Sequence, residues 1–132
     1  MPMNEMRGIW QGKRVDNGEW ITGDLSRIKN ADQFFIDNYT VDPSTLGECT
    51  GLPDKNGNPI FEGNQISFET ISGSIRTGTV FWYGGVWYVD GRSAYGTEFI
   101  YRLDYVDFKS VEIICDIHDN PGLMKDKVQN DK

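Results

Sequence analysis

Three side chains of this 132-residue chain could take part in nucleophilic catalysis, namely Cys49, Cys115 and His118. A nucleophile needs a base within hydrogen-bonding reach. His118 is the single histidine, so Cys49–His118 and Cys115–His118 are the cysteine–histidine pairs that the chain allows. Cys115 lies in an apolar run just before His118, which is typical of a core position. Two Cys and one His cannot complete a structural zinc site. We therefore expect no catalytic residue, no metal site and no cofactor.

Acidic side chains are numerous but carry little positional information. With 20 Asp and Glu residues, several carboxylate pairs will lie close together by chance, so a glycosidase-type pair cannot be inferred. The segment 54–58 has the residue types of a calcium loop, but Gly57 stands at its fourth position and Gln65 at its twelfth, unlike an EF-hand. We expect an Asx-stabilised turn in this segment instead.

Aromatic residues flank Gly84-Gly85, which predicts a tight hairpin turn. A two-residue loop there places Val80 and Trp82 opposite Val89 and Trp87 on one face. It places Phe81 and Tyr83 opposite Tyr88 and Val86 on the other face. Both faces are therefore apolar, so the hairpin is either covered on both sides or meets a partner. The candidate interaction surface consists of Trp82, Tyr83, Trp87 and Tyr88.

The same aromatic side chains could stack on the bases of single-stranded nucleic acid. The surrounding charge opposes this alternative, because residues 59–118 contain Arg76, Arg92, Arg102 and Lys109 against eight acidic side chains. The net charge of −7 also repels duplex DNA. We expect core or interface aromatics rather than a nucleic-acid surface.

Residues 1–7 show no apolar signal-peptide segment, and no run in the chain approaches the length of a membrane span. We expect a cytoplasmic protein without membrane contact, with its cysteines reduced.

The chain has two β-rich parts that must position these residues, and they meet at residues 50–63, a stretch with many turn signals. Leu52-Pro53, Asn56-Gly57 and Asn58-Pro59 each favour a turn, so we expect no long strand to cross this stretch. It separates an N-terminal β-rich subdomain, residues 1–58, from a C-terminal unit, residues 59–132.

The N-terminal subdomain is predicted to begin with a hairpin over residues 7–25. A two-residue Asn17-Gly18 loop would place Val15 opposite Trp20 and Trp10 opposite Leu25, although a longer loop stays open because Asp16 and Glu19 would then face each other. Residues 26–32 are predicted to form a loop and residues 33–39 a third strand. Asp42 and Pro43 indicate a capped helical turn over residues 42–47.

The C-terminal unit is predicted to be a small, partly open SH3-like or OB-like β-barrel. Its expected strands cover residues 65–71, with Ile66 and Phe68 on one face, then 75–82, the strand after Gly85, 98–101 and 110–117. An irregular link is expected over residues 104–108. Asn120-Pro121 indicates a short C-terminal helix over residues 122–128. The fold class is thus mainly β.

Two motifs resemble the YopX family of phage and prophage proteins. The first is Thr50-Gly51-Leu52, Asp54-Lys55-Asn56-Gly57 and Ile60-Phe61-Glu62-Gly63, and the second is Ile117-His118-Asp119-Asn120-Pro121. The opening from Arg7-Gly8 to Trp20 is also similar to family members. The chain departs from the family pattern at Asn64, where an Asp is common, and at Gly122, where a Glu is common.

This resemblance implies a phage- or prophage-encoded accessory protein in a bacterial host. It implies no defined activity and no catalytic residue. Together with the apolar hairpin, it leads us to expect a non-enzymatic protein-interaction module. The expected partner is a host or phage protein, or a second copy of the chain. The alternative is a small single-strand-binding barrel that uses residues 80–89.

Overall fold

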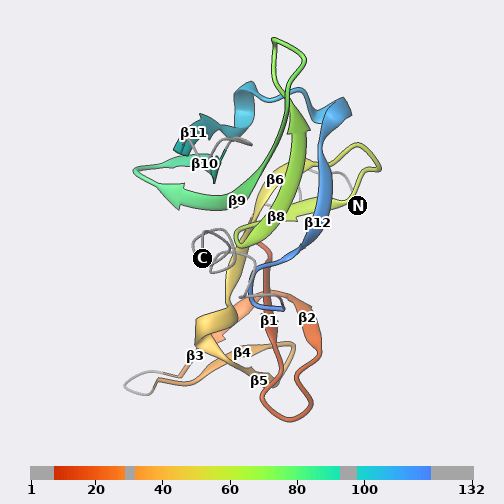
Figure 1. Ribbon diagram of the computed structural model, residues 1–132. Coiled ribbons are helices and arrows are strands. Elements are labelled where there is room, and N and C mark those ends of the chain that lie inside the picture. Colours follow the sequence, from red (N-terminus) through yellow and green to blue (C-terminus); the bar gives the residue numbers. More distant parts are fainter. Residues whose placement is uncertain (1–7, 29–31, 93–97, 120–132) are drawn as a thin grey trace, which may run out of the picture.

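The computed structural model describes residues 8–28, 32–92 and 98–119. The fold is mainly β, with three antiparallel sheets and three short 3-10 turns in the described ranges. A three-stranded sheet lies at one end of the molecule and a five-stranded sheet at the other, with a four-stranded sheet between them (Figure 1). The expected β class is therefore confirmed.

The N-terminal hairpin consists of β1 (Trp10–Lys13) and β2 (Trp20–Gly23). Its predicted register is wrong by two residues, because Lys13 rather than Val15 pairs with Trp20. Beyond Lys13 the chain also pairs with another strand, although the Arg14 N–H still donates to the Glu19 carbonyl at 2.9 Å. Arg14 forms a bridge with Val41, and the Val15 N–H donates to the Thr40 carbonyl at 2.9 Å. The competing strand therefore lengthens the loop.

Residues 25–41 form a small sheet of their own, in the order β3-β4-β5, which corrects two expectations. Part of the predicted loop is strand β3 (Leu25–Arg27). The predicted single strand is two strands, β4 (Phe34–Ile36) and β5 (Tyr39–Val41). They are joined at Asp37 and Asn38, whose φ angles of 49° and 70° let a tight hairpin turn form without glycine.

The capped helical turn is confirmed as the 3-10 turn η2 (Pro43–Thr45). Asp42 caps it by accepting a hydrogen bond from the Ser44 N–H at 3.0 Å. The chain then enters β6 (Gly47–Pro53).

As expected, no long strand crosses the turn-dense stretch: β6 extends into it but ends at Pro53, and the chain turns over residues 54–58 before β7 (Pro59–Phe61). Gly51, with φ 80°, lies where the pairing with β7 shifts register, so one glycine absorbs the irregularity. The Asx turn is confirmed, since Asp54 Oδ1 accepts the N–H groups of Asn56 and Asn58 at 2.9 and 2.8 Å. The predicted boundary between residues 58 and 59 falls inside this β6–β7 hairpin.

The five-stranded sheet has the order β11-β10-β9-β8-β12. Its strands are β8 (Asn64–Glu69), β9 (Ile75–Tyr83), β10 (Val86–Arg92), β11 (Glu98–Arg102) and β12 (Glu112–Asp116). The register predicted around Gly84-Gly85 is confirmed, with Trp82 opposite Trp87 and Val80 opposite Val89. The expected irregular link is the pair of 3-10 turns η3 (Leu103–Tyr105) and η4 (Phe108–Ser110).

Among the described strands no sheet closes into a barrel, because β11 and β12 lie at opposite edges of the five-stranded sheet. The SH3-like barrel of the sequence analysis is therefore not confirmed. The C-terminal helix expected over residues 122–128, together with Asn120 and Pro121, lies outside the described residues.

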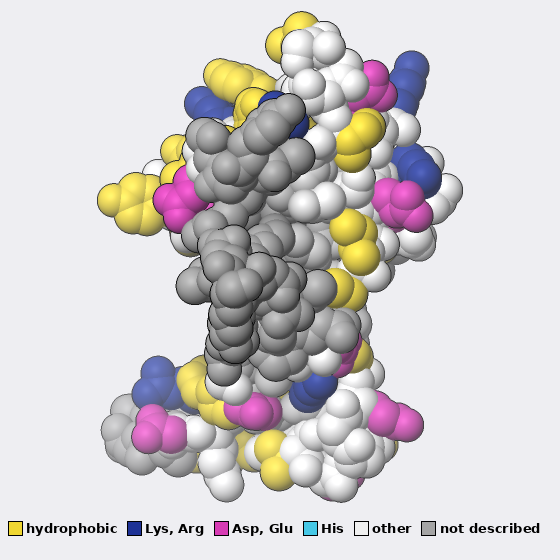
Figure 2. Space-filling view, viewed as in Figure 1, with side chains coloured by type: hydrophobic (Ala, Val, Ile, Leu, Met, Phe, Trp, Pro, Cys, Tyr) yellow, Lys and Arg dark blue, Asp and Glu magenta, His cyan; other side chains and the backbone are white. Residues whose placement is uncertain are grey.

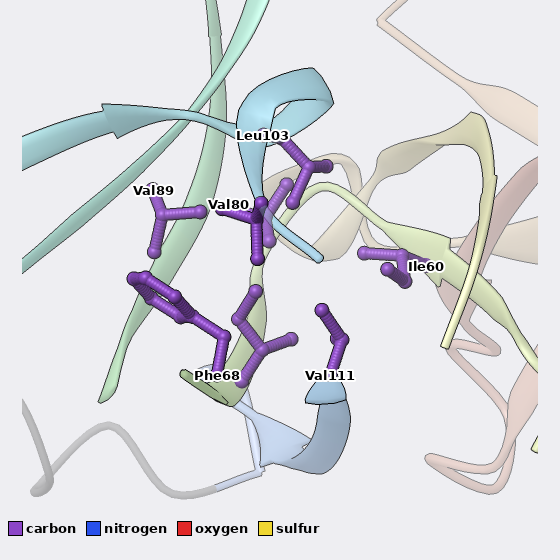
Figure 3. Packing of buried hydrophobic residues seen from close by; sticks show 8 residues of the cluster. Ile60, Phe68, Val80, Val89, Leu103 and Val111 are labelled. Carbon is purple, nitrogen blue, oxygen red and sulfur yellow. The ribbon is translucent and has the colours of Figure 1, made fainter. Parts of the chain in front are cut away.

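The main core fills the concave side of this sheet (Figure 3). Ile66 and Phe68 share the buried face, as predicted, at 0% and 1% exposure. Val80 and Val89 come from the central strands, Ile60 from β7, and Leu103 and Val111 from the links that close the core. The described residues include no helix long and apolar enough to cross a membrane.

Gly47 in β6 lies directly against the backbone of the turn that precedes β8. A Cβ at Gly47 would collide with the main-chain carbonyl of Glu62. The two segments are also paired by the Glu62 N–H, which donates to the Glu48 carbonyl at 3.0 Å. A side chain at residue 47 would push β7 and β8 away from β6.

We predict that Gly47→Ala lowers the free energy of unfolding by about 3 kcal/mol or more, because the clash involves main chain that cannot rotate away. Gly57→Ala is the matched control, since Gly57 has φ 84° but open space around it. Strain alone should cost that control roughly 1–2 kcal/mol. Urea unfolding of both variants checks the order, and an equal or smaller loss for Gly47→Ala would contradict the packing argument.

Candidate interaction surface and the buried carboxylate beneath it

The four predicted interaction residues lie on one hairpin but on two different faces. Strand alternation places Trp82 and Trp87 on the concave side with Val80 and Val89, and Trp87 packs against the core. The two indole rings meet edge-on at 4.8 Å. Tyr83 and Tyr88 point to the opposite, outer side. The structure therefore separates the predicted surface into two pairs.

The outer side carries a cluster that we call the outer aromatic patch, defined as Phe81, Tyr83, Tyr88 and Ile100. Phe81 and Tyr88 stack with ring centroids 5.5 Å apart and an interplanar angle of 25°. Tyr83 is 72% exposed and Ile100 is 62% exposed. Hydrophobic side chains project at the end of the β9–β10 hairpin in the space-filling view (Figure 2). The patch combines a fixed aromatic pair with exposed apolar side chains.

Sequence reasoning missed two members of the patch. Phe81 could have been found, because the predicted register already placed it opposite Tyr88. Ile100 could not, since it joins the patch by pairing with Asp90 across β10 and β11. The residues between those strands include no Asn-Gly, Asp-Gly or Gly-Gly pair that would set their register.

Arg102 borders the patch beside Tyr88, but its charge is already engaged. Its Nε and Nη2 atoms donate to the Asp104 carboxylate at 3.1 and 2.9 Å. The hydrogen bond with Arg102 holds the pKa of Asp104 below its usual range. Asp90 adds a negative charge on the same outer face. This electrostatic setting does not attract phosphate groups.

Glu62, a residue of the central motif, contacts the backbone of the hairpin near its turn. Its Oε2 accepts the Trp82 N–H at 3.4 Å. Burial raises the pKa of this carboxyl, and the nearby Glu48 raises it further. The motif residue thus positions the hairpin rather than reaching the outer face.

The most constrained polar group of the described residues is Asp116, at the end of β12, which is 6% exposed. Its Oδ2 accepts from Gln11 Nε2 at 2.9 Å and from Asn64 Nδ2 at 3.3 Å. Its Oδ1 accepts the His118 N–H at 2.9 Å and lies 2.6 Å from His118 Nδ1. One carboxylate therefore joins β1, β8 and the end of β12. Burial raises its pKa, although the contacts with His118 oppose that shift.

Asp119 makes a second connection to the N-terminal hairpin. Its carboxylate forms a 2.7 Å ion pair with Lys13 and accepts the Trp20 indole N–H at 2.8 Å. Burial by itself would raise the pKa of Asp119, but the bonds from Lys13 and Trp20 outweigh burial and keep this pKa below its usual value. The Trp20 and His118 rings also meet edge-on at 6.1 Å. The end of the last strand is thus anchored on β1 and β2.

Two of the residues with nucleophilic potential, His118 and Cys49, are bonded or buried. His118 uses Nδ1 on Asp116. Cys49 is buried at 3% exposure, and burial raises the pKa of its thiol, which makes it a poor nucleophile at neutral pH. Within the described residues neither cysteine forms a disulfide bond.

The central motif builds the corner beneath this carboxylate. Thr50 Oγ1 accepts the Leu52 N–H at 3.1 Å, and buried Phe61 donates its N–H to Asn64 Oδ1 at 2.7 Å. Gly63 has φ 94°, and a Cβ there would lie 3.2 Å from His118 Cε1. The two motifs noticed in the sequence therefore meet in space, at Gly63 and His118.

The family model of the YopX protein matches residues 3–125. The chain belongs to the YopX family. The match spans both motifs and confirms the resemblance on which the sequence analysis relied. Among curated proteins, no relative matches the chain. In this YopX-family fold, the first motif forms most of the β6–β7 hairpin. Its last residue, Gly63, contacts His118 of the second motif, just after β12.

We predict that Asp116→Asn lowers the free energy of unfolding by about 1–3 kcal/mol, because a buried donor loses its acceptor. The Asn64 amide cannot reverse to compensate, since its Oδ1 already accepts the Phe61 N–H. Asp24→Asn, on an exposed side chain, is the control and should stay within about 0.5 kcal/mol of wild type. Equal stability of the two variants in urea would contradict the assignment.

The raised pKa of Asp116 predicts a pH dependence of known sign. The folded protein holds the Asp116 proton more tightly than the unfolded chain does. The stability of wild type relative to Asp116→Asn should therefore fall as the pH rises from the ordinary value of 3.8 through the raised pKa. Paired urea titrations across this range test the sign, and a relative gain in wild-type stability would refute the desolvation argument.

Proposed function

We propose that this protein is a non-enzymatic protein-interaction module, encoded by a phage or prophage and active in the bacterial cytoplasm. Its outer aromatic patch contacts a host or phage protein. The observation that carries the proposal is the fixed Phe81–Tyr88 stack beside exposed Tyr83 and Ile100. Clustered exposed apolar groups of this kind mark interaction sites more often than isolated ones do.

The arrangement favours a protein partner on energetic grounds. Tyrosine and phenylalanine give large contact areas and lose little side-chain entropy, and both are enriched at protein interfaces. Phe81 and Tyr88 are already ordered by stacking on the strands, which reduces the cost of binding further. The patch is therefore suited to a partner that covers it with its own apolar side chains.

The charges around the patch favour a protein partner over single-stranded nucleic acid. A single-strand binder combines stacking aromatics with a basic groove. Beside the patch, Arg102 is paired with Asp104, Asp90 is acidic, and the chain carries a net charge of −7. Phosphate groups would meet little positive charge there.

We also propose that the five-stranded sheet is related to the SH3-like barrels. Strands β8 to β11 form a meander, and β12 returns beside β8 after the 3-10 turns η3 and η4. This strand order supports an open relative of the SH3 barrel. Such small sheets serve as platforms for many binding functions, so the relationship supports an interaction role without identifying the partner.

The test is an affinity capture from host lysate and from phage-infected cells, with half of each sample treated with nuclease. We predict that a protein partner survives nuclease and that Tyr83→Ala/Ile100→Ser reduces its recovery at least about tenfold. The matched control is Tyr39→Ala/Val15→Ser, which removes similar exposed side chains from the opposite end of the molecule.

A partner lost with nuclease would replace this proposal by the single-strand-binding alternative. Equal recovery by the two double variants would show that the patch is not the contact surface. Sedimentation of both variants tests a second copy as the partner, because a patch-dependent dimer should dissociate only in Tyr83→Ala/Ile100→Ser.

A further inference from the structure

A groove of about 830 Å³ opens at one end of the five-stranded sheet, separate from the outer aromatic patch. Phe68, Tyr101 and Val106 form its apolar floor. One wall is the turn between β8 and β9, and the other is the link that contains η3. The groove thus lies on the concave side, where the core reaches the surface.

The two walls are held at a fixed separation by Ser110. Its Oγ accepts the Glu69 N–H at 3.0 Å from one wall and donates to the Asp107 carbonyl at 2.7 Å on the other. The turn itself is closed by the Thr70 N–H, which donates to the Ser74 carbonyl at 2.8 Å. A groove with fixed walls costs little ordering entropy when a ligand binds.

The rim combines exposed apolar groups with a positioned aromatic ring. Ile71 is 105% exposed at the tip of the turn, and Tyr105 is 72% exposed on the facing wall. The guanidinium of Arg102 lies 4.5 Å from the Tyr105 ring centroid and is itself held by Asp104. Tyr105 is therefore exposed but oriented.

Two carboxylates, Glu69 and Asp107, line the same groove from opposite walls. Within the described ranges neither forms an ion pair with a lysine or arginine. Two uncompensated negative charges beside aromatic rings match a cationic side chain, which can pair with a carboxylate and lie against a ring. The same charges repel the phosphates of nucleic acid.

We propose that this groove binds an extended peptide segment of another protein, with apolar side chains on the Phe68–Tyr101 floor. An arginine or lysine of the peptide lies between Glu69 and Asp107 and contacts Tyr105. The proposal rests on the proposed interaction function and adds a second contact site with a defined ligand chemistry. Aromatic-lined grooves on small β-domains are suited to extended peptides, since these need few ordering steps to bind.

The test begins with a displayed library of random dodecapeptides selected on the immobilised full-length chain. We expect the enriched peptides to carry arginine or lysine next to proline, leucine or aromatic residues. An enriched peptide, labelled with fluorescein, is then titrated with each variant by anisotropy. Its affinity should decrease with salt, because screening weakens exposed ion pairs.

Glu69→Gln/Asp107→Asn should lower the affinity for this peptide about tenfold, because it removes both negative charges from the groove. Asn retains the acceptor that caps η4 through the Lys109 N–H, so the groove should keep its shape. The control Asp24→Asn/Asp37→Asn changes the net charge equally on exposed side chains far from the groove. Tyr105→Ala should weaken binding as well, whereas Tyr83→Ala/Ile100→Ser should not.

Several results would overturn the assignment. They are an absence of basic residues among the enriched peptides, unchanged affinity of Glu69→Gln/Asp107→Asn, or a dimer sensitive to Tyr105→Ala in sedimentation. Peptide binding lost only in Tyr83→Ala/Ile100→Ser would move the ligand to the outer aromatic patch, which overturns the groove but leaves the interaction function in place.

Discussion

The structure depends on one buried carboxylate, that of Asp116. An ionised group removed from water is stable only when its oxygens find donors, and the donors of Asp116 come from residues far apart in the chain, with Gln11 at a separation of 105 residues. Asn64 and His118 complete the set. This requirement fixes the position of β12 against both β1 and β8, and so fixes the five-stranded sheet relative to the N-terminal hairpin.

The surfaces proposed for binding follow from that arrangement. With β8 and β12 held in place, the β8–β10 meander curves over its own core and presents Phe81 and Tyr88 on the outside. At the end of the same sheet, the link between β11 and β12 returns close enough to β8 for Ser110 to bridge to Glu69. The anchored last strand thus gives the molecule two preformed surfaces. One is the outer aromatic patch, and the other is the groove, which combines aromatic rings with two carboxylates.

Turn chemistry made part of this fold predictable. Gly84-Gly85 set the register of the β9–β10 hairpin, and Asp42-Pro43 located η2. It failed where tertiary pairing competed, because β5 pairs with Arg14 and Val15 just beyond the end of the β1–β2 ladder. The Asp116 network was out of reach, because a single aspartate in a strand gives no sign of partners more than 50 residues away. The groove was missed for a similar reason, since its walls come from two separate links.

Amide hydrogen exchange of Gln11→Ala, compared with wild type, tests the central claim most directly. If Asp116 couples the N-terminal hairpin to the five-stranded sheet, removing one donor from β1 should reduce protection in β1 and in β12 together, along with the start of β8. Reduced protection confined to β1 and β2, with β12 unchanged, would contradict the claim that this carboxylate holds the two parts as one unit.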